Sequence, residues 1–185
     1  MSAGIIDPTK GARREVESRG SNVSMTTSLR GMRVGLLENK KRHAADILDA
    51  VGKSLESMDE EITLVRLTKH DFAMPLPDAL VKEIQEACDV VVIGVGDCGS
   101  CSASAVADGI NLEARGIASA VICTDAFRVT SQAMAKLEGQ PDFQFLLTAH
   151  PIANLTADDI AARADELAAR VHDRLTSASL LGALA

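Results

Sequence analysis

The sequence predicts an α/β fold built on a parallel sheet, and two observations support this prediction. From Arg33 onward, short apolar runs alternate with longer segments in which apolar residues have helical spacing. The runs are apolar throughout rather than at every second residue, which is typical of strands that helices cover on both faces. Five such strand-helix units fit an open, doubly wound, flavodoxin-like sheet with strand order 2-1-3-4-5.

The elements follow in order along the chain. The strands are predicted at Arg33–Leu37, Ile62–Leu67, Asp89–Val95, Ala118–Cys123 and Phe143–Thr148. The helices are predicted at Ala44–Ser57, Pro77–Cys88, Ser102–Arg115, Thr130–Leu137 and Ala157–Thr176. The last helix is the clearest, because Thr156 can cap its first N–H groups and Asp158 and Asp159 favour the positive end of its dipole. Its apolar stripe consists of Ile160, Ala164, Leu167, Val171 and Leu175.

The length of 185 residues suits one sizeable domain, which we place at residues 31–185. Residues 1–30 are polar, rich in Ser, Thr and Arg, and lack sustained periodicity. We expect them to form either a disordered arm or an extended segment that docks on a neighbour.

Composition excludes several classes of partner. The net charge is −7, and the chain has no Trp, no Tyr and four Phe. Nucleic-acid binding is therefore not expected, because it needs positive charge and aromatic rings on which nucleobases stack. The apolar runs are too short to span a membrane, and no secretory leader is recognisable at the N-terminus. Four cysteines are too few for a disulfide scaffold, so we expect a cytoplasmic protein. The expected partner is a small-molecule substrate, and the chain acts alone, as a homo-oligomer or with a companion subunit.

Cys98-Gly99-Ser100-Cys101 is the most informative motif in the chain. It lies between an apolar strand and a helical segment, so both thiols fall on one turn, within reach of a disulfide. Free N–H groups and the positive dipole end at the start of a helix favour a thiolate there. The motif therefore predicts a reactive-cysteine site, with Cys98 the more exposed thiol and Cys101 in the first helical turn.

The predicted strand order brings further residues to the same edge of the sheet. The third strand would lie between the first and fourth, where ligands of such sheets bind. Glu38 and Asp125 follow those two strands, so we expect them to line a single pocket with Cys98 as candidate acid/base groups. His150, at the end of the fifth strand, is a third candidate. The alternative for each carboxylate is a helix cap, and for His150 a structural role.

Four more residues are expected to bind the substrate, namely Asn39, Gly99, Ser100 and Thr124. Glycine at position 99 would let the backbone approach a ligand closely. Lys40 and Lys41 either attract an anionic substrate or are simply solvated. The carboxylate of Asp97 would raise the pKa of the neighbouring thiol if it points inward.

Two other readings of these residues remain open. Gly94-Val95-Gly96-Asp97-Cys98-Gly99 matches the GxGxxG pattern of dinucleotide sites, but it follows the third strand and lacks an acidic residue at the expected spacing. A zinc site would need two more ligands, and Cys88 and Cys123 are better placed as core thiols. We therefore expect no metal.

The segment Val92–Phe127, with GDCGSCSAS and CTDAF, resembles the UGSC-motif family, which is named for a selenocysteine-Gly-Ser-Cys site. The likeness extends to Ile6–Thr9, Leu37–Lys40 and His150–Ala153. More distantly, the motif is similar to the selenocysteine-x-x-Cys site in the substrate-specific subunits of glycine reductase. The resemblance implies that Cys98 takes the selenocysteine position and Cys101 the resolving position.

Together these inferences predict a cysteine-dependent enzyme without a bound cofactor. Cys98 would attack a small, anionic electrophile, Cys101 would resolve the adduct as a disulfide, and an external thiol would reduce that disulfide. The alternatives are hydrolytic or lyase use of Cys98, a non-catalytic subunit that binds a partner, and a dinucleotide-binding domain using Gly94, Gly96 and Gly99.

Overall fold

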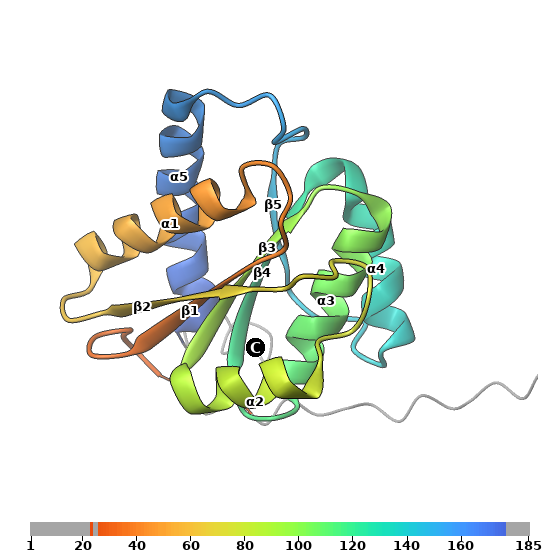
Figure 1. The fold of residues 1–185 in the computed structure, drawn as a ribbon, viewed down its shortest axis with the longest axis horizontal. Coiled ribbons are helices and arrows are strands. Elements are labelled where there is room, and N and C mark those ends of the chain that lie inside the picture. Colours follow the sequence, from red (N-terminus) through yellow and green to blue (C-terminus); the bar gives the residue numbers. More distant parts are fainter. Residues whose placement is uncertain (1–22, 24–25, 177–185) are drawn as a thin grey trace, which may run out of the picture.

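A computed structural model describes residue 23 and residues 26–176 of the chain. Its five strands form one parallel sheet in the order β2-β1-β3-β4-β5, which confirms the predicted flavodoxin-like topology (Figure 1). The strands are β1 (Arg33–Glu38), β2 (Thr63–Thr68), β3 (Val90–Gly96), β4 (Ala118–Thr124) and β5 (Leu146–Thr148).

Within the described residues, five α-helices cover the sheet. They are α1 (Ala44–Met58), α2 (Asp78–Ala87), α3 (Gly99–Glu113), α4 (Arg128–Leu137) and α5 (Ala157–Leu175), and a short 3-10 helix, η2 (Asp125–Phe127), precedes α4. Helices α1 and α5 lie on one face of the sheet, while α2, α3 and α4 lie on the other (Figure 1).

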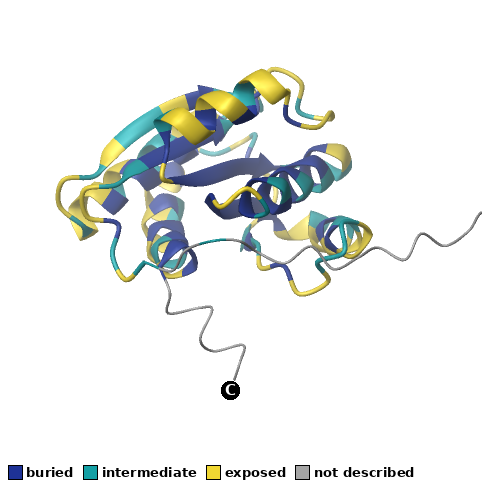
Figure 2. Ribbon diagram, turned by 90° about the horizontal axis from the view of Figure 1, so that it is seen from below, coloured by how far each residue is buried: buried dark blue, intermediate teal, exposed yellow. Residues whose placement is uncertain are grey.

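The core therefore has two halves, one on each face of the sheet. Leu36 and Val95 face α1 and α5, whereas Leu37 and Ile93 face α2 and α3, because successive side chains of a strand point to opposite faces. Figure 2 shows buried central strands beneath helices whose outer faces are exposed. Strand β2 is partly exposed because it lies at the edge of the sheet.

The last helix begins as its sequence predicts. The Thr156 hydroxyl accepts the N–H of Asp159 at 3.2 Å, and the Asp159 carboxylate accepts the N–H of Thr156 at 2.9 Å. This reciprocal pair satisfies N–H groups that the helix itself leaves without partners. The predicted apolar stripe of α5 is buried in the core half shared with α1.

Element boundaries differ from the predictions by more than two residues in two places. Helix α3 begins at Gly99, three residues earlier than the predicted Ser102, because Cys98 caps it. Strand β5 covers only Leu146–Thr148, because a turn ties the N–H of Phe143 to the carbonyl of Gln140 and pairing with β4 begins at Leu146.

Most of the expected N-terminal arm, residues 1–30, lies outside the described residues. Within the described part of it, Leu29 is fully buried in the core half beside α1 and α5. Its N–H donates to Asp59 Oδ2 at 2.7 Å. The globular packing of the domain thus includes at least Leu29, two residues before the predicted domain start.

Candidate functional site

The CGSC turn joins the end of β3 to the start of α3. Cys98 is the N-cap of α3, and its Sγ accepts the N–H of Cys101 at 3.3 Å. Its sulfur also lies 3.6 Å from Ser100 Oγ. A sulfur in this position receives the N–H groups and the positive end of the helix dipole, which favours negative charge.

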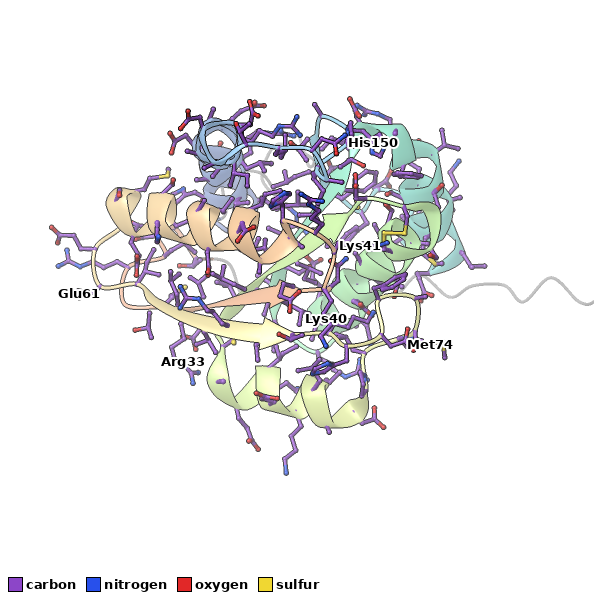
Figure 3. All side chains as sticks on the ribbon, turned by 45° about the horizontal axis from the view of Figure 1, so that its top comes forward. Arg33, Lys40, Lys41, Glu61, Met74 and His150 are labelled. Atoms are coloured by element: carbon purple, nitrogen blue, oxygen red, sulfur yellow. A yellow bond between two sulfur atoms is a disulfide. The ribbon has the colours of Figure 1, made fainter. Side chains whose placement is uncertain are left out.

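The two cysteines of the motif differ in exposure, as expected from the sequence. Cys98 is half-buried, whereas Cys101 is 1% exposed. The structure joins their sulfur atoms, with the Cα atoms 5.4 Å apart, inside the range of about 4.4–6.8 Å that a disulfide bridges. Figure 3 shows this bond at the start of α3, and Lys40, Lys41 and His150 lie at the same end of the strands. One thiol is thus accessible and the other is enclosed beside it.

A small pocket opens beside Cys101, on the α2 and α3 side of the sheet. Its lining residues are Leu37, Asn39, Lys69, Phe72, Ile93, Cys101, Ala105 and Asp108. Lys41 places its Nζ 4.4 Å from the centre of the Phe72 ring, a cation–π contact at the rim. The pocket therefore combines apolar walls with an amide, an ammonium group and a carboxylate.

Lys69 and Asp108 form a buried ion pair in this pocket, with side chains 4% and 2% exposed. The Lys69 ammonium also donates to Ser104 Oγ at 2.7 Å, and Asp108 Oδ1 accepts the N–H of Leu76 at 3.1 Å. Burial raises the pKa of the Asp108 carboxyl to about 6, against the opposing effect of the Lys69 charge. Asp108 thus titrates closer to neutral pH than an ordinary carboxyl.

Glu38 is not brought to this pocket. It follows Leu37 in β1 and therefore points to the opposite face, where it lines a separate pocket with Asp49 and Arg66. Its carboxylate accepts the N–H of Lys40. The expectation that Glu38, Cys98 and Asp125 line a single pocket is not met by the structure.

Asp125 and His150 belong to a second group of side chains at the same edge. His150 Nδ1 lies 2.8 Å from Asp97 Oδ1 and 3.2 Å from Thr124 Oγ1, and Asp125 Oδ1 accepts the N–H of His150 at 3.1 Å. Because a carboxylate can only accept, Nδ1 carries a proton and Nε2 is the atom left for other partners. The ring of Phe127 packs edge-on against the imidazole, with centroids 5.4 Å apart.

The predicted substrate-binding residues fall into different positions. Asn39 is buried, lines the pocket beside Cys101 and donates to the carbonyl of Val95 at 3.0 Å, so its amide ties β1 to β3. Ser100 is exposed beside Cys98, and Thr124 is buried against His150. Gly99 faces open space, since an added Cβ would meet no atom within 4 Å.

The glycines of the GxGxxG pattern have separate structural settings. At Gly96 an added Cβ would lie 2.8 Å from Cys123 Sγ and from Ser102 Cα, so glycine allows β3 to approach α3 and β4. The packing of the protein thus accounts for Gly96. It does not account for Gly99, which has neither a left-handed backbone nor a crowded Cβ position.

The two remaining cysteines are core thiols, as predicted. Cys88 and Cys123 are free and buried, and burial raises the pKa of each thiol to about 11. Both stay protonated at neutral pH, so neither is present as the reactive thiolate. Among the residues that the structure describes, no cluster of three or more His, Cys, Asp or Glu could hold a metal ion.

The sequence analysis assigned no role to Lys69 or Asp108, and it did not predict that Asp97 pairs with His150. Lys69 directly follows β2 and so reaches the same sheet edge as the other loops. Cys101, Ala105 and Asp108 are spaced i, i+4 and i+7, which places them on one face of a helix. Those two signals were readable in the sequence, whereas the pairing of Asp97 with His150 depends on the fold.

The fold and the site define an α/β protein of flavodoxin-like topology with a CGSC turn at the carboxyl edge of its sheet. The sequence pattern of the UGSC family matches residues 4–177, and the chain belongs to that family. No match was found among curated proteins. Within the described part of the chain, none of the helices has the length and apolar character needed to cross a membrane.

Proposed function

We propose that this chain is a thiol-dependent enzyme in which Cys98 attacks a small, anionic, electrophilic substrate and Cys101 resolves the adduct. The observation that carries the proposal is the position of Cys98. It is the half-exposed cap of α3, beside a buried second cysteine and a small pocket. Membership in the UGSC family supports the use of this motif.

The attack would form a bond between the Cys98 sulfur and a substrate carbon that carries an electron-withdrawing group. The bond to the leaving group breaks, and its electron pair departs with that group. The N–H groups at the start of α3 stabilise the thiolate before the attack, and they can hold an anionic group of the substrate over the open space at Gly99.

Resolution would follow through Cys101. Its sulfur attacks the sulfur of Cys98, the bond from Cys98 to carbon breaks, and the carbon keeps the electron pair and takes a proton. The substrate carbon is then reduced by two electrons, and the two cysteines are oxidised to a disulfide. An external thiol reduces that disulfide and completes the turnover.

Acid/base roles are proposed for His150 alone among the predicted groups. Its Nδ1–H is held by Asp97, so Nε2 is oriented for proton exchange at the sheet edge. The carboxylates of Glu38 and Asp125 accept backbone N–H groups, of Lys40 and His150 respectively, so we assign them a role in shaping loops.

The test is iodoacetamide labelling of the reduced protein across pH, with each labelled cysteine identified by mass spectrometry. An activated Cys98 should be labelled first. Its labelling rate should reach half of its maximum at a pH well below the pKa of about 8.5 that is typical of free cysteine. Labelling of Cys98 that follows a free cysteine would contradict the enzyme and favour a partner-binding subunit. Cys98→Ser is the control, because it should lose the fast phase entirely.

A further inference from the structure

The buried Lys69–Asp108 pair has no part in the proposed attack by Cys98, yet it lines the pocket beside Cys101. Burying two opposite charges costs solvation free energy that their attraction offsets only in good geometry. Here each partner has a further hydrogen bond, from Lys69 to Ser104 and from Leu76 to Asp108. The pair is therefore fully held in place at the inner wall of the pocket.

We propose that Asp108, held by Lys69, accepts the thiol proton of Cys101 when Cys101 attacks the sulfur of Cys98. This inference rests on the proposed function, since it concerns the resolving step of that reaction. A sulfur–sulfur bond forms, the bond from Cys98 to the attached group breaks, and the electron pair leaves with that group. The proton of Cys101 passes to the Asp108 carboxylate, and it returns to Cys101 when an external thiol reduces the disulfide.

Three observations support a proton acceptor here. Cys101 is 1% exposed, so its sulfur has little direct contact with bulk solvent. Asp108 lies two helical turns further along the same face of α3, and it lines the same pocket as Cys101 and Ala105. The amide, ammonium and carboxylate groups among the apolar walls of the pocket can hold a water molecule that relays the proton. Because burial raises the pKa of Asp108 to about 6, this carboxylate is ionised at neutral pH yet more basic than usual.

The other groups that face the pocket cannot replace it. Within the described part of the chain, the titratable side chains that line the pocket are Lys69, Cys101 and Asp108. Strands β1 and β3 contribute the apolar side chains of Leu37 and Ile93, and the loop after β1 contributes the uncharged amide of Asn39. Lys41 approaches from the β1–α1 loop, but as a cation over Phe72 it has no lone pair for a proton at neutral pH.

The pair also has a structural effect that the test must separate. Ser104 Oγ donates to the carbonyl of Met74 at 2.9 Å, and Asp108 accepts from Leu76, so α3 holds the loop that follows β2. Glu113→Gln offers a matched control on the same helix. Glu113 is buried and paired with Arg174, and it does not line the pocket.

The experiment mixes reduced protein with one equivalent of dithiobis(nitrobenzoate) and follows the release of nitrothiobenzoate by stopped flow from pH 5 to 9. The first release reports the reaction of Cys98, and the second, independent of reagent concentration, reports attack by Cys101. We expect the second phase of the wild type to slow as the pH falls through about 6, where Asp108 gains a proton. In Asp108→Asn it should be at least roughly tenfold slower at pH 7, while Glu113→Gln should match the wild type.

Lys69→Gln provides a second variant in case Asp108→Asn does not fold. Without the lysine charge the carboxylate holds its proton more strongly, so the half-maximal pH of the second phase should move upward. If both variants keep the wild-type pH profile, the inference is overturned and the pair is only structural. If the wild type shows no second phase, the proposed function is overturned and this inference with it.

Discussion

Asp97 and His150, which are 53 residues apart in the sequence, are joined by a hydrogen bond of 2.8 Å from the imidazole Nδ1–H to the carboxylate. Asp97 directly precedes Cys98, so its negative charge lies next to the proposed nucleophile. A nearby carboxylate disfavours a thiolate. The hydrogen bond from His150 offsets part of that charge, which links the loop after β5 to the reactivity of the CGSC turn.

His150→Gln should slow the labelling of Cys98 by iodoacetamide at pH 7 by roughly threefold to tenfold, because it leaves the Asp97 charge less compensated. The double variant Asp97→Asn/His150→Gln removes that charge and should recover most of the wild-type rate. Second-order rate constants for the labelling of Cys98, measured at low and high salt for each variant, test these two expectations. Equal rates in wild type and His150→Gln would show that the pair does not act on Cys98.

Gly99→Ala and Gly96→Ala should have opposite effects on stability. An added Cβ at Gly99 meets nothing in the protein, so alanine should raise the free energy of unfolding by a few tenths to about 1 kcal/mol. At Gly96 the Cβ would meet Ser102 and Cys123, and alanine should cost about 1–3 kcal/mol.

Urea denaturation measures both differences. Gly99→Ala should also slow the labelling of Cys98 by at least roughly threefold if the open space at Gly99 is where a ligand approaches. A more stable variant with unchanged labelling would show that this glycine has no part in access to the thiol.

Asp59 should make stability depend on pH. The Leu29 N–H, then the His172 and Ser28 side chains, lower the pKa of this carboxyl. The folded state therefore binds fewer protons than the unfolded chain, so this contribution is present above the unfolded pKa of about 3.9 and is lost as the pH falls through the lower folded value.

The variant Asp59→Asn should lower the free energy of unfolding by about 1 kcal/mol at pH 7. The difference in the free energy of unfolding between this variant and the wild type should become smaller toward pH 3, as measured by chemical denaturation at each pH. The exposed Glu56→Gln on α1 controls for the loss of a surface charge. A gap that stays constant with pH would contradict the assignment.

Cys98 should prefer an anionic electrophile. The ratio of its labelling rates with iodoacetate and iodoacetamide should exceed that of free cysteine by roughly twofold to tenfold at low salt, because the helix terminus and nearby lysines attract the carboxylate. Lys40→Gln/Lys41→Gln should reduce the ratio, whereas Lys53→Gln, exposed on α1, should not. A ratio equal to that of free cysteine would argue against an anionic substrate.

Much of the fold was predictable because its signals are local and consistent. Apolar runs such as Val90–Val95 and the capped stripe of α5 each specify one element, and the alternation of strands and helices restricts the topology. The start of α3 was placed late because the sequence does not show that a cysteine, an uncommon capping residue, would take the N-cap.

The site was only partly predictable. The motif identified Cys98 and Cys101, and the strand order brought Asn39 and His150 to the right edge of the sheet. Glu38 lies at the expected edge of the sheet, but its side chain points to the face opposite the pocket beside Cys101. The reason is that each step along a strand reverses the face to which a side chain points. The Lys69–Asp108 pair joins a loop to a helix across 39 positions, a contact that only packing determines.

The most direct test of the account is intact-mass analysis of the reduced protein after reaction with glutathione disulfide. The wild type should end as the Cys98–Cys101 disulfide without a glutathione adduct, since Cys101 displaces the adduct from Cys98. Cys101→Ser should retain one glutathione, mapped to Cys98, and Cys98→Ser should retain none. An adduct that persists on the wild type, or one that forms on Cys101 in Cys98→Ser, would contradict the roles assigned to the two thiols.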